Sequence, residues 1–307
     1  MNRPKMIMMC GLVGSGKSYK AKELAEQCDA NIHSSDDIRE ELSGDINNQD
    51  INELVFKTLH NRIKEDLQNG KNCIYDATNI SYKRRMSFLE SLNKIPCEKI
   101  CVLMATPYEQ CLKNNASRDR VVPEGVIERM YRTFDVPWYY EGWDDIRIEY
   151  THGSQWSLGL AQDWIESVKD YNQENAHHTL TLGEHCWQAF KYIDQCEIDS
   201  VYPGEVKYAT MLHDCSKPFC KTFTNTKGEV TDQAHYYFHE HISSYDSLFY
   251  QTPSCRLYIA VLIRWHMQPY YWEKDNNEKL QNKYRKLWGE ALYNDLLLLH
   301  KADLAAH

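Results

Sequence analysis

Short apolar runs alternate with longer amphipathic segments through the first half of the chain. The runs lie at residues 6–10, 73–79, 100–104 and 146–150, and a weaker one lies at 28–33. Runs of this length indicate buried strands, and the segments between them have the apolar spacing of helices. Alternating strands and helices predict an α/β fold, in which a parallel sheet is flanked by helices. We expect this first domain to span residues 1–150.

The second half has a different pattern. From residue 177 the apolar positions keep a helical spacing, and only a hairpin around residues 225–228 is suggested by the turn residues there. Residues 151–176 combine glycines, a short helical pattern and polar residues, which is typical of a linker with a bridging helix. We therefore expect an all-α domain over residues 177–307. A chain of 307 residues is long enough for two domains, each with its own core.

Composition narrows the location and the partners. The chain has no signal-peptide pattern and no apolar run that could cross a membrane, and its 11 cysteines are scattered without a C-x-x-C pair. We therefore expect reduced thiols, a cytoplasmic location and no membrane partner. The net charge of −9 excludes a non-specific coat on nucleic acid, so such a partner would be held by a local basic patch or by one end.

A phosphate-binding pattern follows the first apolar run. Residues 11–18 read Gly-Leu-Val-Gly-Ser-Gly-Lys-Ser, which is G-x-x-x-x-G-K-S between a strand and a helix. Glycines let consecutive N–H groups converge on a phosphate, and the helix N-terminus adds partial positive charge. We expect Lys17 to reach the β- and γ-phosphates and Ser18 to ligate Mg²⁺, so the predicted ligand is ATP with Mg²⁺. The nucleotide-binding residues are then Gly11, Gly14, Ser15, Gly16, Lys17 and Ser18.

Charged and polar residues follow the other predicted strands. Asp36 is either the N-cap of the next helix or a general base at the carboxyl end of a parallel strand, and we favour the base. Asp76 is placed to hold Mg²⁺ through water, whereas Thr78 and Asn79 either orient a ligand or form a plain turn. The basic triplet at 83–85 is either a solvated face or an attractor of polyanions.

Two arginines stand one residue apart ahead of a proline. Arg118 and Arg120 precede Pro123 and are interpreted as a lid over the donor phosphates, because the planar guanidinium binds phosphate oxygens bidentately. The alternative is a pair of surface arginines.

Taken together, these motifs resemble the 5′-hydroxyl polynucleotide kinase branch of the P-loop kinases over residues 5–150. The resemblance rests on the loop, on Ser-Asp-Asp-x-x-Arg, on Asp-Ala-Thr-Asn followed by Lys-Arg-Arg, and on the arginines ahead of Val-Val-Pro. It implies that Asp36 is the general base and that Arg39 contacts the phosphate of the acceptor. It also implies that Arg118 and Arg120 stabilise the transferring phosphoryl group. Small-molecule kinases share the loop, so the loop alone does not separate the two classes.

Histidines are concentrated in the second half, since only His33 and His60 of 13 precede residue 151. Helices could bring imidazoles and carboxylates there to one point, and mixed nitrogen and oxygen donors suit Mn²⁺, Fe²⁺, Co²⁺, Ni²⁺ or Zn²⁺. The candidate ligands are His185, His213, Asp214, His239, His266 and Asp303. Asp214 could bridge to a second ion held by His239 and His266, and two ions together can activate water and bind phosphate oxygens.

This ordered set resembles the HD phosphohydrolase superfamily over residues 177–305. The most specific phrases are Leu-His-Asp-Cys-Ser-Lys-Pro, then Phe-His-Glu at 238–240 and Ala-Asp at 302–303. The resemblance implies an all-helical domain that hydrolyses phosphoesters with metal. It implies that the ligands of one metal are His185, His213, Asp214 and Asp303. His239 and His266 match the second site of binuclear members.

Three other residues of this half have expected roles. By the same resemblance Lys217 contacts the substrate phosphate; the alternative is a surface lysine after a turn. We expect His235 to line the pocket and His241 to be structural.

A kinase joined to a phosphoesterase is consistent with an enzyme that modifies the two ends of a broken nucleic-acid strand. Many ribonucleases leave a 5′-hydroxyl and a 2′,3′-cyclic phosphate, whereas a ligase needs a 5′-phosphate and a free 3′-hydroxyl. Fused kinase–HD end-healing enzymes form a family that this chain resembles, with the kinase first. The sequence therefore predicts a bifunctional enzyme that heals RNA or DNA ends, broken tRNA among them, ahead of a separate RNA ligase.

Two rival interpretations stay open. The acidic net charge favours a small-molecule kinase joined to a nucleotide phosphohydrolase. A nucleotide-sensing regulator, whose sites bind without turnover, is the other.

Overall fold

The computed structural model describes residues 3–151, 153–175, 179–275 and 277–307. Packing divides the chain into two compact units, Met1–Met130 with Pro137–Ser154 and Tyr131–Val136 with Gln155–His307. The short segment Tyr131–Val136 thus belongs to the second unit although it lies inside the range expected for the first domain. Its Phe134 ring packs 4.7 Å from the ring of Tyr245, centroid to centroid, which explains this placement. The expected start of the helical domain at residue 177 lies outside the described residues.

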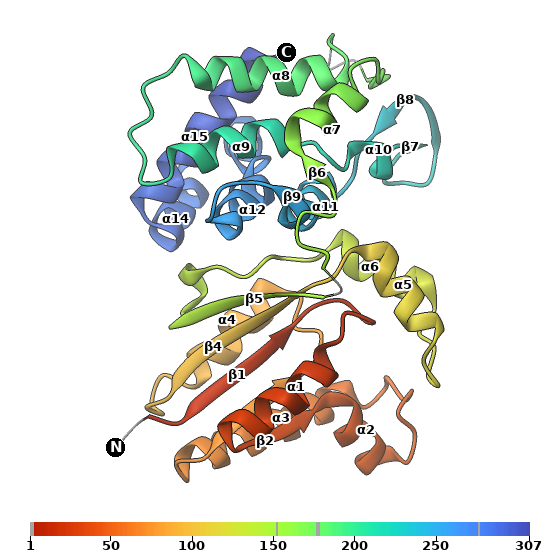
Figure 1. The fold of residues 1–307 in the computed structure, drawn as a ribbon, viewed down its shortest axis with the longest axis vertical. Coiled ribbons are helices and arrows are strands. Elements are labelled where there is room, and N and C mark those ends of the chain that lie inside the picture. The colour runs from red at the N-terminus through yellow and green to blue at the C-terminus, as the bar shows by residue number, and fades with distance from the viewer. Residues whose placement is uncertain (1–2, 152, 176–178, 276) are drawn as a thin grey trace. The chain divides into compact units, whose positions relative to one another are not determined.

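The first unit is built on a parallel sheet of five strands in the order β2-β3-β1-β4-β5 (Figure 1). This confirms the predicted α/β class. The strands are β1 (Lys5–Cys10), β2 (Ala30–Ser34), β3 (Asn72–Asp76), β4 (Glu98–Ala105) and β5 (Asp145–Tyr150). The connection after β1 leads toward β2 at one edge of the sheet, whereas the connection after its neighbour β3 leads past β1 to β4. Open α/β sheets bind ligands outside the carboxyl ends of two such neighbouring strands, where the connections run in opposite directions.

Helices cover both faces of this sheet. They are α1 (Lys17–Cys28), α2 (Ser35–Ser43), α3 (Asn52–Gln68), α4 (Tyr82–Ser91), α5 (Tyr108–Ala116) and α6 (Glu124–Arg132). On one face α1 packs Ala21 and Leu24 into a core with Ile7, Met9, Ile74, Ile100 and Val102. On the other face the ring of Tyr75 contacts His60 of α3 and Phe88 of α4. Successive strand residues point to opposite faces, so each apolar run feeds both layers.

The second unit is mainly helical. Its helices are α7 (Ala161–Ser167), α8 (Leu182–Asp194), α9 (Pro203–Leu212), α10 (Lys217–Cys220), α11 (His239–Asp246), α12 (Arg256–Trp265), α13 (Gln268–Asp275), α14 (Glu278–Trp288) and α15 (Glu290–Ala305). Thr181 and Glu184 form a capping box that fixes the start of α8. A Cβ on Gly183 would lie 2.7 Å from the carbonyl oxygen of Ile165, so glycine is required where α8 passes close to α7.

Short strands complete this unit. The antiparallel pair β7 (Thr222–Thr224) and β8 (Val230–His235) forms the hairpin expected around residues 225–228. A two-residue parallel pair, β6 (Gly159–Leu160) with β9 (Tyr250–Gln251), was not foreseen, because two residues carry no alternation pattern. These strands are minor additions to a helical architecture.

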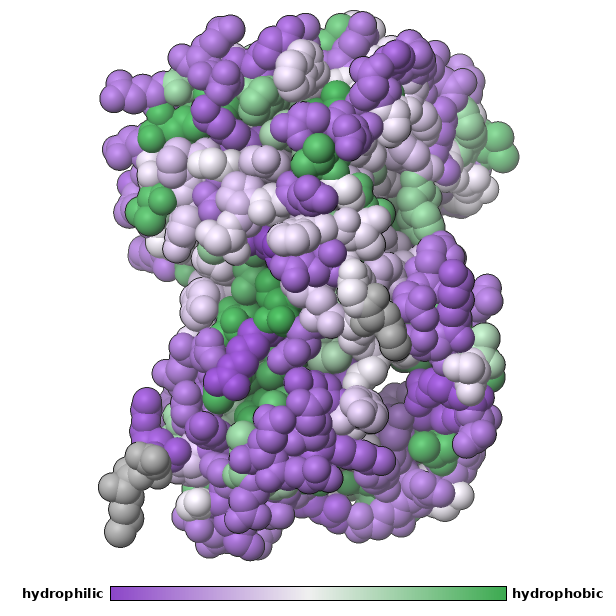
Figure 2. All heavy atoms as spheres, viewed as in Figure 1, coloured by the Kyte–Doolittle hydropathy of each residue, from purple (hydrophilic) through white to green (hydrophobic). Residues whose placement is uncertain are grey.

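The visible surface of each unit is mostly hydrophilic, and hydrophobic residues appear on it in scattered groups (Figure 2). Within the described residues, none of the helices combines the length and the apolar character needed to cross a membrane.

Candidate active sites

The loop after β1 depends on its glycines. Gly14 and Gly16 have φ angles of 81° and 88°, in the left-handed region that other residues rarely adopt. A Cβ on Gly14 would also lie 2.3 Å from the carbonyl oxygen of Cys111, which leaves no room for any side chain. The loop therefore has the tight backbone turn expected of a phosphate-binding loop, and its last glycine directly precedes α1.

Lys17 and Ser18 begin α1 directly after this loop, and Asp76 at the end of β3 interacts with both. The Nζ atom of Lys17 donates to the Leu12 carbonyl oxygen at 2.6 Å, so the side chain curls back over the loop. Burial lowers the pKa of Lys17, against the opposing charge of Asp76. Burial raises the pKa of Asp76, although a hydrogen bond from Ser18 works against that shift. The expected Mg²⁺ residues Ser18 and Asp76 are thus in direct contact.

Asp36 lies between two arginines. Its Oδ1 accepts from Nη1 of Arg39 at 2.8 Å, and its Oδ2 lies 2.9 Å from Nη1 of Arg120. The N-cap of α2 is Ser34, whose hydroxyl accepts from the Asp37 amide, so Asp36 does not serve as the cap. Each carboxylate oxygen of Asp36 is thus paired with one arginine, and the side chain keeps an accessibility of 41%.

The two lid arginines face different groups. Burial is the main cause that lowers the pKa of Lys17, and the charge of Arg118 adds a smaller effect in the same direction. Arg120 instead contacts Asp36 and donates through Nε to Asn47 Oδ1 at 2.9 Å. Arg39 is buried, and its Nη2 donates to Asn52 Oδ1 at 2.8 Å. Arg120 is thus at Asp36, and the expectation that both arginines cover the donor phosphates stays a prediction.

Asn79 and Arg85, which follow β3, make contacts inside the first unit. The Asn79 amide donates to the Met9 carbonyl oxygen at 2.8 Å, which ties this loop to β1. Arg85, the last residue of the basic triplet, is fully buried and forms a bidentate pair with Glu141 at 2.6 and 2.7 Å. Neither interpretation offered for the triplet, a solvated face or an attractor of polyanions, describes Arg85. Only Lys83 and Arg84 of the triplet are exposed.

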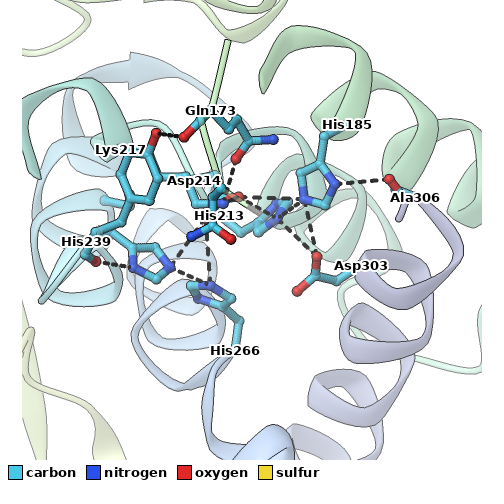
Figure 3. A network of polar contacts seen from close by, with 12 residues as sticks. Gln173, His185, His213, Asp214, Lys217, His239, His266, Asp303 and Ala306 are labelled. Atoms are coloured by element: carbon cyan, nitrogen blue, oxygen red, sulfur yellow. Dashed lines mark hydrogen bonds and ion pairs between the residues drawn. The ribbon is translucent and has the colours of Figure 1, made fainter. Parts of the chain in front are cut away.

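In the second unit the predicted ligands converge on one buried point (Figure 3). The Nε2 atoms of His185 and His213 are 3.0 Å apart, and Asp303 Oδ1 lies 3.1 Å from Nε2 of His185. Asp214 Oδ2 lies 3.4 and 3.3 Å from the same two Nε2 atoms. Separations of this size are those of ligands around a single cation. We call these four residues the first metal set.

A second set adjoins the first through Asp214. The Nε2 atoms of His239 and His266 are 3.1 Å apart, and Asp214 Oδ1 lies 3.3 and 3.9 Å from them. The same Oδ1 is buried without a hydrogen-bond partner among the described residues. Buried carboxylate oxygens in proteins nearly always have a hydrogen-bond partner or another ligand. Asp214 therefore faces one set with each oxygen, which fits a carboxylate that bridges two cations.

Backbone carbonyls orient all four imidazoles. In each ring Nδ1 lies 2.6–3.1 Å from a main-chain carbonyl oxygen. The pairs are His185 with Ala306, His213 with Thr210, His239 with Tyr236, and His266 with Ile263. A ring that donates through Nδ1 presents the lone pair of Nε2, so facing Nε2 atoms at about 3 Å would repel without a cation between them. The donor set thus fits metal binding.

The buried carboxylates of the cluster need positive charge close to them. Burial would lower the pKa of His213, but the carboxylates of Asp214 and Asp303 raise it to about 10. Burial would raise the pKa of Asp214, yet Lys217 and His213 hold it well below its usual range. Burial, His239 and His213 lower the pKa of His266 to about 3, which keeps that ring neutral. A proton on His213 or a divalent cation can satisfy the carboxylates.

Several contributors escaped sequence reasoning. Gln173 accepts from Lys217 Nζ at 2.9 Å, and Lys217 also lies 2.7 Å from Asp214 Oδ2. Tyr270 donates to Asp303 Oδ2 at 3.1 Å, and Cys186 lies within ligand range of His213 and Asp214. Gln173 falls in the expected linker, where no motif marks it.

A cavity of about 660 Å³ opens onto this cluster. Lys217, Asp214, His239, His266 and Asp303 line it, together with aromatic residues. His235 lines it too, as expected. His241 lies within hydrogen-bond distance of the Phe134 carbonyl oxygen, at 3.2 Å, and so holds the segment Tyr131–Val136. A pocket of this size takes a small ligand or the end of a larger one.

Comparisons with known proteins bear mainly on the first unit. A family model described as an AAA domain matches residues 6–137. An L-seryl-tRNA(Sec) kinase of Methanococcus maripaludis is 28% identical over 186 residues, which cover 58% of this chain and 69% of that protein. A putative kinase of Chloroflexus aurantiacus aligns over 50% of this chain and 88% of its own, with a TM-score of 0.43 and 16% identity.

A chain of the Pnkp1/Rnl/Hen1 RNA repair complex also aligns, with a TM-score of 0.37 and 22% identity. The alignment covers 42% of this chain and 43% of that one. The matched family model covers the sheet and the phosphate-binding loop. The first unit thus has the parallel-sheet α/β fold and the phosphate-binding loop of P-loop kinases.

Proposed function

We propose that this protein is a bifunctional enzyme that heals broken nucleic-acid ends, with RNA as the expected substrate. The kinase unit would phosphorylate 5′-hydroxyl ends with ATP, and the second unit would remove 2′,3′-cyclic phosphates and 2′- or 3′-phosphates. The observation that carries the proposal is the pairing, in one chain, of a P-loop kinase unit with the buried His/Asp cluster around Asp214. The two products, a 5′-phosphate and a 3′-hydroxyl, are what a separate RNA ligase requires.

The kinase half of the mechanism follows from Asp36 and the loop. Asp36 would accept the proton of the attacking hydroxyl, because a carboxylate beside the acceptor serves as general base in phosphoryl transfer. Arg39, held by Asn52, would bind a phosphate of the acceptor strand. Lys17 would contact the β- and γ-phosphates. Mg²⁺ held by Ser18 and Asp76 would neutralise charge on those phosphates.

The hydrolytic half rests on the two metal sets. Bound by them, divalent ions would supply Lewis acidity and a coordinated water of lowered pKa. Asp214 would hold both ions in register, since each of its oxygens faces one set. Lys217, which lies 2.7 Å from Asp214, would turn to a non-bridging phosphate oxygen of the substrate. Gln173 would steady the Lys217 amine between these positions.

The kinase proposal is tested with acceptors of three kinds. Phosphate transfer from γ-labelled ATP is measured with a 5′-hydroxyl RNA oligonucleotide, a single nucleoside and seryl-tRNA. We expect the oligonucleotide to be the best acceptor. A preference for the nucleoside would support a small-molecule kinase and would overturn end healing.

The curated relative favours a second candidate acceptor. That relative is a kinase of L-seryl-tRNA(Sec), and it is 28% identical to this chain. A side-chain hydroxyl carried on tRNA is therefore the alternative to a 5′-hydroxyl end. Label found on serine after release from the tRNA would support it, whereas label at the 5′ end would exclude it.

The hydrolytic proposal is tested on an oligonucleotide with a 2′,3′-cyclic phosphate, in a panel of Mn²⁺, Ni²⁺, Co²⁺, Fe²⁺ and Zn²⁺. We expect metal-dependent opening and release of phosphate that is lost in Asp214→Ala and kept in Asp36→Ala. Binding of nucleotides without hydrolysis under every metal would support a sensing regulator instead. Loss of both activities in either variant would overturn the picture of two separate sites.

A further inference from the structure

One residue beside the metal cluster combines strain with exposure. Phe238 has a φ angle of 67°, in the left-handed region, where a bulky side chain is strained. The residue is 46% exposed. Glycine or asparagine would make the same turn at little cost and without an exposed apolar ring. Phe238 directly precedes His239, so the strained position is at the edge of the second metal set.

Phe238 lines the cavity that opens onto the cluster. From another element, Tyr271 of α13 also lines it, with half of the residue exposed. Tyr237 lines the cavity as well and stacks on His235 at a centroid distance of 5.3 Å and an interplanar angle of 12°. The lining of the cavity therefore combines carboxylates and imidazoles with flat rings, two of which are well exposed.

The charges of the cavity limit what fits it. Among the described residues that line the cavity, Lys217 is the one lysine or arginine. Glu240, Asp214 and Asp303 add negative charge to the lining. Apart from the cations that the metal sets would bind, this lining offers one cationic side chain for phosphate oxygens, and a triphosphate would need more. A ligand with one phosphoester and a flat, uncharged ring fits better. Aromatic side chains stack on nucleobases of any sequence, because every base has a π-face.

We propose that Phe238 and Tyr271 form a nucleobase-stacking subsite for the terminal nucleoside whose phosphoester is cleaved at the metal cluster. The inference rests on the proposed hydrolytic function and adds its substrate class, a single-stranded 3′ end that is read by stacking and not by base identity. The cost of the strained Phe238 backbone is consistent with a ring that is held in place for a ligand.

The test compares nucleoside 2′,3′-cyclic phosphates with ribose 2′,3′-cyclic phosphate, which lacks the base. For the full-length protein with its metal, we expect kcat/KM to be higher for the nucleosides by roughly 5- to 150-fold, the range that one base stack is worth. Adenosine and uridine substrates should differ little from one another. Phe238→Ala and Tyr271→Ala should each bring the ratio of nucleoside to base-free substrate toward one, whereas Phe238→Trp and Tyr271→Phe should keep it.

Phe223→Ala is the matched control, because Phe223 is also an exposed phenylalanine, at 40%, but is not part of the cavity lining. It should retain the wild-type ratio. An unchanged ratio in Phe238→Ala and Tyr271→Ala, or equal rates for both substrates in the wild type, would overturn the subsite and leave the hydrolytic function standing. Absence of hydrolysis of both substrates under every metal would overturn the hydrolytic function together with the subsite.

Discussion

The guanidinium of Arg120 lies 2.9 Å from one carboxylate oxygen of Asp36 while Arg39 holds the other at 2.8 Å. Arg39 is buried and fixed by Asn52, so it positions the carboxylate. Arg120 is more exposed and covers the oxygen that an acceptor hydroxyl would have to reach. Acceptor binding and departure of Arg120 from Asp36 are therefore expected to be coupled.

Asp36→Ala should lower kcat for phosphate transfer to a 5′-hydroxyl by about 10²- to 10⁴-fold, the usual contribution of a general base. The neighbouring Asp37→Ala is a matched control, since Asp37 is exposed, its amide donates to the Ser34 hydroxyl, and its charge acts on Asp76 as that of Asp36 does. Transfer from γ-labelled ATP is the measurement. Equal losses in the two variants would contradict the assignment of Asp36.

Arg118→Ala and Arg120→Ala should affect different kinetic constants. The charge of Arg118 acts on Lys17, so its loss should mainly raise KM for ATP. Arg120 contacts Asp36, so its loss should mainly change kcat and KM for the acceptor. Initial rates with each substrate varied in turn will separate the two patterns, and a reversed pattern would refute this division of roles.

The α/β class and the phosphate-binding loop could be predicted from sequence because both depend on local patterns. The apolar runs became β1, β3, β4 and β5, and the G-x-x-x-x-G-K-S motif set the turn ahead of α1. Local patterns also picked out the histidines and aspartates that meet at Asp214. Their convergence needed the fold of the whole helical unit, yet the residue types were already the right donors.

Other features could not be predicted because distant packing decides them. Arg85 is buried by Glu141, which is 56 residues away in the chain. Gln173 reaches Lys217 from a stretch without motifs, and the segment Tyr131–Val136 leaves the first unit to pack in the second. Propensity and periodicity carry no information about contacts of this range.

Removal of metal should destabilise the second unit. A ligand that binds only the folded state stabilises it by about 2.7 kcal/mol at 100 times its Kd. We expect chelation to lower the Tm of this unit, and Mn²⁺, Ni²⁺ or Zn²⁺ to restore it. His185→Ala should lose the response, whereas His235→Ala, which removes a histidine outside both metal sets, should keep it. Thermal unfolding followed by far-UV circular dichroism is the measurement, and a metal response that survives in His185→Ala would contradict the first metal set.

Asp246 should make the stability of the second unit depend on pH. Burial raises its pKa from 3.8 to about 6, although hydrogen bonds from Tyr131 and Ser216 oppose the shift. The folded state therefore binds the extra proton between these values, and the free energy of unfolding falls as pH rises through that window. Across this window the contribution of Asp246 to the free energy of unfolding falls by about 3 kcal/mol, and above it the contribution no longer changes with pH.

Asp246→Asn should remove that slope. Urea unfolding at several values between pH 4 and pH 7 will show it as a difference between wild type and variant. Asp194→Asn, on an exposed carboxylate of α8 whose side chain is 55% accessible, should keep the wild-type slope. A wild-type stability that rises between pH 4 and pH 6 relative to Asp246→Asn would be the wrong sign for a buried carboxyl of raised pKa.

The ion pair of Arg85 and Glu141 should be costly to break and cheap to replace. Both side chains are fully inaccessible, and the Trp143 indole adds a hydrogen bond to Glu141 at 3.0 Å. Arg85→Met alone would leave Glu141 charged and buried, so it should lower the free energy of unfolding of the first unit by about 3–5 kcal/mol. The double variant Arg85→Met/Glu141→Leu removes both charges and keeps most of the volume, so it should recover most of that loss. Denaturant unfolding of all four members of the cycle measures the coupling between the two residues. Equal destabilisation of the single and the double variant would mean that packing of the Arg85 side chain, and not an unpaired charge, carries the cost.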